Sequence, residues 1–238
     1  MKNKNLLLAI LGLSLCTVSC SNDDTKNEGE NVKLIAKSTY GSNSVKTAKT
    51  TAKNNSTVEV TSFKINIKEI EFEMDDDFSS GDGFYDDDDD IELKGPFELS
   101  ILGGATEIVG LNIPNGVYEE VEFKIHKSNN SSSDMFNKSI KMEGTINAVP
   151  FIFWHNVEED FEIDYEDTNQ QLVVTENAKV NVVFDFDLNA VLANVDLSSA
   201  VDGNKDGIIE ISPNDPDGNR SLANKIKDKI KDFCDLED

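Results

Sequence analysis

The residues whose types and spacing could do chemistry lie near the C-terminus, in a stretch that begins at Asp202. Oxygen-bearing side chains stand at its first, third and fifth positions, which are Asp202, Asn204 and Asp206. Gly207 follows at the sixth position, where a sharp turn is needed, and Glu210 stands at the ninth. Alternating side-chain oxygens around a tight turn are ligands that Ca²⁺ prefers, so this spacing predicts a calcium site.

The spacing resembles the first nine residues of an EF-hand or dockerin-type loop. The resemblance implies that Ile208, at the seventh position, gives its backbone oxygen to the ion. Those loops carry a bidentate acid at the twelfth position, where this chain has Pro213. The remaining ligands of the calcium ion are therefore expected from Glu210 or from the polar residues Asn214, Asp215, Asp217 and Asn219. The alternative is a pair of turns whose acids face water.

The remaining polar residues form no recognisable catalytic motif. The two histidines, His126 and His155, come without a recognisable nucleophile motif, and both are expected to be structural. Glycosidase chemistry needs two carboxylates at a set separation, and the 46 acidic residues offer no preferred pair. We therefore expect a non-enzymatic protein. The alternative is a hydrolase that acts on envelope or environmental polymers.

Acidic segments elsewhere could also hold cations. The runs Asp75–Asp77 and Asp86–Asp90 lack the alternate spacing that points oxygens at one ion, so a solvated loop is favoured over a calcium-ordered one. Alternate acids also line one face of an expected strand, where a wet acidic face is favoured over a cation site: Asp160, Glu162, Asp164 and Glu166.

The N-terminal segment has the layout of a signal peptide. Lys2 and Lys4 precede the apolar run Leu6–Leu15, and small residues lead to Cys20. A run of about 10 apolar residues is too short to cross roughly 30 Å of hydrocarbon as a helix. Residues 1–19 are thus predicted to be a cleaved signal rather than a permanent span.

The tetrad Thr17-Val18-Ser19-Cys20 resembles the lipobox of Gram-negative lipoproteins. The resemblance implies a surface lipoprotein, with lipid on Cys20 as the membrane anchor and residues 20–30 as an acidic tether. The sequence Ser21-Asn22-Asp23-Asp24 is similar to an acidic export tag, so we expect the outer membrane, with the domain exposed at the cell surface. A periplasm-facing orientation and a secretory peptide without lipid are the alternatives.

Charge and cysteine content limit the partners and the source of stability. A net charge of −24 repels phosphate backbones and anionic headgroups, so nucleic-acid binding is excluded and membrane contact is expected through the lipid alone. The expected ligand is a protein or a glycan. Cys16 leaves with the signal and Cys20 carries lipid, so Cys234 has no disulfide partner and is expected to be a buried, inert thiol.

Period-two alternation of apolar residues predicts strands along most of the chain. It is clearest in Val180–Leu188, Val121–Ile125 and Phe161–Tyr165. In Val58–Met74 the alternation changes phase after Ile67, which predicts a bulge. Further strands are predicted at Val32–Tyr40, Ile91–Leu102, Thr106–Ile113, Ser139–Ile146, Phe151–Trp154 and Gln171–Thr175.

These strands predict an all-β fold: one antiparallel β-sandwich domain over residues 31–238, of Greek-key, immunoglobulin-like or prealbumin-like type. An amphipathic helix is expected at the C-terminus. Ser221 is its predicted N-cap, and its apolar stripe consists of Leu222, Ile226, Ile230 and Phe233.

Four segments also resemble a domain of unknown function that recurs in bacterial lipoproteins. They are TSFKINIKEIEFE, LKGPFELSIL, LNIPNGVYEEVEFKIHK and VNVVFDFDL. The resemblance covers roughly Val58–Leu188, implies a β-sandwich and supplies no catalytic residues.

Overall fold

The computed structural model describes residues 29–41, 48–51, 56–74, 91–165, 171–175 and 178–237. The predicted signal peptide, Cys20, most of the tether and the acidic segment 75–90 lie outside these residues.

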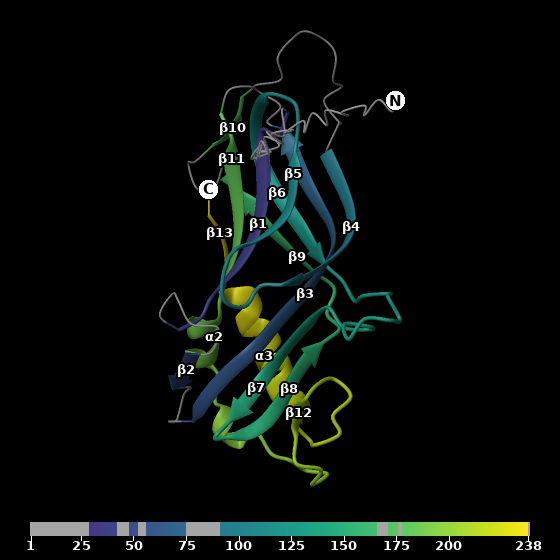
Figure 1. Cartoon of the computed structure of the whole chain (residues 1–238), viewed down its shortest axis with the longest axis vertical. Helices are drawn as coiled ribbons and strands as arrows, with labels where there is room; N and C mark the ends of the chain where they lie inside the picture. The colour runs from purple at the N-terminus through teal and green to yellow at the C-terminus, as the bar shows by residue number, and fades with distance from the viewer. Residues whose placement is uncertain are drawn as a thin grey trace, which may run out of the picture.

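Strands dominate the described residues (Figure 1). The strands are β1 (Val32–Thr39), β2 (Ala48–Thr51), β3 (Thr57–Met74), β4 (Ile91–Ser100), β5 (Thr106–Leu111), β6 (Gly116–Ile125), β7 (Ile140–Ile146), β8 (Val149–His155), β9 (Glu159–Asp164), β10 (Leu172–Val174), β11 (Val180–Asp187), β12 (Ile209–Ile211) and β13 (Cys234–Glu237). The helices are α2 (Leu188–Asn194), the short 3-10 helix η3 (Leu197–Ser199) and α3 (Arg220–Asp232).

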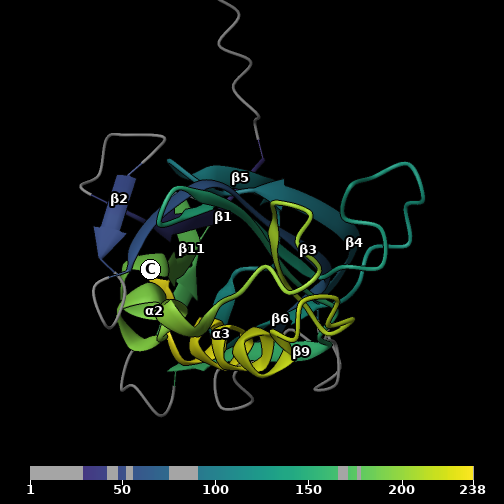
Figure 2. The ribbon, with the colours of Figure 1, turned by 90° about the horizontal axis from the view of Figure 1, so that it is seen from below.

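The strands form two sheets. The smaller sheet has the order β13-β11-β1-β5. The larger sheet has the order β10-β6-β3-β7-β8-β12. In addition, β2 and β4 pair with β3, and β9 pairs with β6. The 18-residue strand β3 organises the larger sheet, because its first half pairs with β7 and its second half with β6 and β4. Seen from below, the strands curl around a common interior (Figure 2). A mostly β protein with a C-terminal helix was therefore predicted correctly.

The predicted bulge in β3 is confirmed. The register with β4 and β6 shifts between Ile67 and Glu69, so one extra residue moves the inward positions from Ile67 to Ile70. Gly95 faces this bulge from β4, where an added Cβ would lie 2.6 Å from the carbonyl oxygen of Ile67. The backbones approach so closely that only glycine fits there.

A purely antiparallel arrangement was the wrong expectation. β1 pairs with β11 in parallel, starting with Val32 beside Val180, and β12 pairs with β8 in parallel, starting with Ile209 beside Phe151. Alternation of apolar residues shows which face of a strand is buried, but it carries no information on the direction of the neighbour. Both parallel partners are far apart in sequence, as parallel pairing requires.

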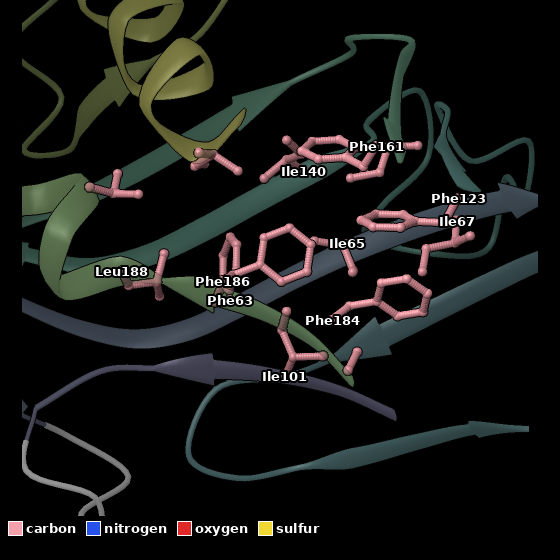
Figure 3. Close-up of a cluster of buried hydrophobic side chains, with 14 of the residues drawn as sticks. Phe63, Ile65, Ile67, Ile101, Phe123, Ile140, Phe161, Phe184, Phe186 and Leu188 are labelled. Carbon is pink, nitrogen blue, oxygen red and sulfur yellow. The ribbon is translucent and has the colours of Figure 1, made fainter. Parts of the chain in front are cut away.

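Phenylalanine rings from both sheets meet in the core (Figure 3). The Phe123 ring of β6 stacks on Phe161 of β9 at a centroid distance of 4.8 Å. It also meets the edge of Phe184 of β11 at 4.3 Å, and Phe63 of β3 contacts Phe186 at 5.8 Å. These rings join the two sheets into one hydrophobic core.

The C-terminal helix is present, but its predicted N-cap is wrong. α3 begins at Arg220 with Asn219 as N-cap, so Ser221 lies inside the first turn. Leu222, Ile226 and Ile230 of its apolar stripe are buried, and α3 lies beside β8 and α2 (Figure 1). No helix in the described ranges has the length and apolar character needed to cross a membrane.

Candidate metal-binding loop

Two core residues place the candidate calcium loop, residues 202–210, against the larger sheet. Ile209 and Ile211 of β12 are buried beside β8, whereas Glu210 between them lies on the opposite face. The chain then runs through residues 212–219 into α3. The loop therefore joins a sheet edge to the C-terminal helix.

Asp202 organises the turn at the start of the loop. Its Oδ1 accepts hydrogen bonds from the backbone N–H groups of Lys205 at 2.7 Å and Asp206 at 3.2 Å. Its Oδ2 accepts one from the N–H of Gly207 at 2.9 Å. Gly207 has a φ of 93°, in the region that favours glycine, which agrees with the sharp turn expected at the sixth position.

Three further polar side chains converge within the loop. The Asn204 amide nitrogen donates to Asp206 Oδ2 at 3.1 Å and to Glu210 Oε2 at 3.4 Å. This –NH₂ group thus lies between two carboxylates. Rotation of the amide by half a turn would present its oxygen to the same place, in exchange for the hydrogen bond of 2.9 Å that this oxygen accepts from the Asp206 backbone N–H. The position would then have three oxygen-bearing side chains. Such a set suits a hard cation such as Ca²⁺.

Asp217 is brought to the loop, but as an anchor. It is 5% exposed, and its Oδ1 accepts hydrogen bonds from the backbone N–H groups of Gly203 at 3.1 Å and Asn204 at 3.0 Å. Its Oδ2 accepts from the N–H of Glu210 at 2.6 Å. Any Cβ on Gly203 would lie 2.5 Å from the Asp217 carbonyl oxygen, so this close approach requires glycine.

The other residues that were predicted as further calcium ligands make different contacts. Asp215 Oδ1 accepts a hydrogen bond from the Arg220 N–H at 2.7 Å, at the start of α3. The Asn219 amide donates to the backbone oxygens of Val201 at 2.7 Å and Glu210 at 2.9 Å. Asn214 is exposed. Asp215 therefore caps the start of α3, and Asn219 ties α3 to the two ends of the loop in this structure.

The electrostatics of the loop centre on Glu210. Partial burial raises the pKa of its carboxyl group, and the charges of Asp217 and Asp206 raise it further, while the hydrogen bond from Asn204 opposes them. Ionisation of Glu210 is thus less favourable in the loop than in water when no cation is present. A bound divalent cation would reverse this preference, because it stabilises the charged form.

Within the described ranges, no three His, Cys, Asp or Glu side chains are grouped closely enough to hold a metal ion. The predicted ligand set joins the acids Asp202, Asp206 and Glu210 to the Asn204 amide and the Ile208 backbone oxygen, and in this structure its acids are not gathered around one point. Comparison with protein-family models, with curated proteins and with solved structures gave no match.

The other predicted groups lie apart from this loop. His126 Nε2 is 2.9 Å from Glu158 Oε1 after β6, and His155 ends β8. Asp160 and Glu162 are exposed on β9, as a wet acidic face requires. Cys234 is half-buried and begins β13.

A charged cluster on β6 and β3 is an example of what the sequence analysis missed. Lys124 of β6 lies 2.8 Å from Glu71, 3.1 Å from Glu69 and 3.2 Å from Glu122. These ion pairs raise the pKa of Lys124, and the pair with Glu71 has the largest effect. The available signal was a lysine at a wet position of a strand. Its partners could not be inferred without knowing that β6 pairs with β3.

Proposed function

We propose that this chain is a lipid-anchored, non-enzymatic envelope protein with a binding or structural role, stabilised by Ca²⁺. The N-terminal sequence supports the anchor: a short apolar run with basic residues before it ends in a lipobox-like tetrad at Cys20. Outer-membrane attachment with surface exposure belongs to the same proposal, on the strength of the acidic residues that follow Cys20.

The observation that carries the calcium proposal is the convergence of Asn204, Asp206 and Glu210 around one position. Asp202 holds the turn that brings them together, through three backbone N–H groups. A cation there would neutralise the carboxylates and tie Asn204 and Asp206 of the loop to Glu210 of β12. Because the unfolded chain lacks this arrangement, binding would stabilise the fold by mass action.

Calorimetric titration and thermal unfolding test the calcium site. We expect heat on titration with Ca²⁺ and a higher Tm in Ca²⁺ than in chelator. At a free concentration of about 100 times Kd, the gain in unfolding free energy is about 2.7 kcal/mol. Equal melting temperatures together with no heat of binding would remove calcium from the proposal.

Metabolic labelling tests the anchor. Cells grown with a palmitate analogue should label the wild-type protein and spare Cys20→Ala, because the lipid is attached to the thiol of Cys20. A matched Cys16→Ala variant should keep the label, since Cys16 lies within the predicted signal peptide. Equal labelling of the wild type and Cys20→Ala would contradict the anchor.

Protease treatment of intact cells tests the orientation. A surface-exposed domain should be digested while the outer membrane is closed. Survival of the domain until that membrane is opened would instead place it on the periplasmic face.

The sandwich interpretation and the partner belong to the same proposal. Contacts such as Phe123 with Phe184 lie between the two sheets, as in a sandwich core. A sandwich with polar connecting segments suits the binding of a protein or a glycan, although a fold alone does not define a ligand. Probing an array of envelope glycans with the soluble domain would separate these two ligand classes.

A further inference from the structure

His155 lies at the contact between the larger sheet and α3. It is the last residue of β8, and its Nε2 is 3.3 Å from Oδ1 of Asn224 in the first half of α3. Because an amide oxygen can only accept a hydrogen bond, Nε2 carries the proton and Nδ1 has a lone pair. Nδ1 is buried and has no hydrogen-bond partner among the described residues.

Protonation would change this contact. An imidazolium donates from both nitrogens, so a proton on Nδ1 would place an N–H group and a positive charge where the described part of the chain offers no acceptor. A buried donor without an acceptor is destabilising, and a buried charge more so. The neutral ring is thus the form that this interface accommodates.

The charged neighbours of His155 do not supply the missing acceptor. Lys227 and Asp228 face it from α3 and Glu159 from the start of β9. Glu159 is engaged by Lys227 at 3.3 Å and Lys231 at 2.7 Å, while Asp228 lies 2.7 Å from Lys227. Burial is the largest influence and lowers the pKa of His155. Lys227 lowers it further, whereas Asn224, Asp228 and Glu159 act in the opposite direction.

The helix α3, which this contact holds, is also packed into the core and tied to the 202–210 loop. Leu222 and Ile226 of α3 are buried in the core, and Asn219 ties its start to Val201 and Glu210. Loosening α3 from β8 would therefore also loosen the 202–210 loop.

We propose that His155 is an acid-sensitive latch, which holds α3 on β8 while its ring is neutral and weakens this contact when the ring takes up a proton. A histidine whose pKa is lower in the closed state than in the open one contributes stability above its ordinary pKa. That stability is lost as the pH falls toward the closed-state pKa. The device responds to mildly acidic surroundings and does not depend on the calcium proposal.

Hydrogen exchange tests the latch, with intrinsic exchange rates corrected for pH. Between about pH 7 and pH 5, the opening constant of α3 in wild-type protein should rise by up to about tenfold per pH unit. His155→Gln keeps a donor for Asn224 but cannot titrate, so α3 should lose this dependence. His126→Gln is the control and should behave as the wild type, because His126 contacts Glu158 and not α3.

Equal acid-induced opening of α3 in wild type and His155→Gln would overturn the proposal. The wild type also provides a test that needs no variant. In an NMR titration, the His155 ring should titrate below the usual histidine range, in step with the loss of protection in α3. A normal titration midpoint, or protection that does not follow it, would likewise overturn the latch.

Discussion

The Asp217 carboxylate accepts a hydrogen bond of 2.6 Å from the backbone N–H of Glu210, and its other oxygen binds the N–H groups of Gly203 and Asn204. One buried side chain thus fixes both ends of the 202–210 loop. Both oxygens of Asp217 accept hydrogen bonds from the backbone, so these contacts position the loop without a cation.

Replacing this anchor should cost stability. In Asp217→Asn, an N–H₂ group replaces one acceptor and faces backbone donors, so we expect a loss of about 1–3 kcal/mol in the free energy of unfolding. Chemical denaturation measures this loss. Asp232→Asn, which removes an exposed ion pair with Lys229, should change stability by less than about 1 kcal/mol. Equal effects of the two variants would contradict the anchoring role.

Glu210→Gln should have opposite effects with and without calcium. The pKa of Glu210 is raised in the fold, so its contribution to stability is present below its ordinary pKa and is lost as the pH rises through the folded value. At neutral pH in chelator, the glutamine variant should therefore melt slightly higher than the wild type. Removing a calcium ligand should also abolish the rise in Tm on adding Ca²⁺. Asp160→Asn on β9 is the control and should keep the calcium response.

The loss of unfolding free energy at low pH should depend on Asp134. Hydrogen bonds from Lys64 and then Lys141 lower the pKa of Asp134 to about 2. A lowered pKa contributes stability that is present above the ordinary value and is lost as the pH falls toward the folded one. Asp134→Asn should therefore be less stable at neutral pH and lose less between about pH 4 and pH 2. Denaturation at several pH values checks this, and parallel curves for the two proteins would count against it.

The aromatic core should be sensitive to truncation at Phe123. Its ring contacts Phe161, Phe184 and Phe186, so Phe123→Ala should cost about 3–5 kcal/mol through lost burial and a cavity. Phe136→Ala is the matched control, because that ring is 41% exposed and should cost less than about 1 kcal/mol. A small effect at Phe123 would show that the two sheets do not depend on this cluster.

Much of the strand content was predictable from local pattern. Val180–Leu188 and Val58–Met74 alternate clearly, and even the phase change after Ile67 could be recognised as a bulge, because burial of one face leaves a period of two in the sequence. The short strands β12 and β13 were missed, since three or four residues are too few to show a period. The helix α2 was missed because Leu188 continues the alternation of β11.

The spacing of oxygen-bearing residues in the 202–210 loop was also visible in the sequence, because such a pattern lies within one short segment. Tertiary structure decided what is distant along the chain: that Asp217 anchors the loop, that Asn219 ties α3 to Val201, and that His155 meets Asn224. It also decided the parallel pairing of β1 with β11. Local periodicity reports which side of an element is buried, whereas the choice of partner depends on how the whole chain packs, and that is not encoded in any one segment.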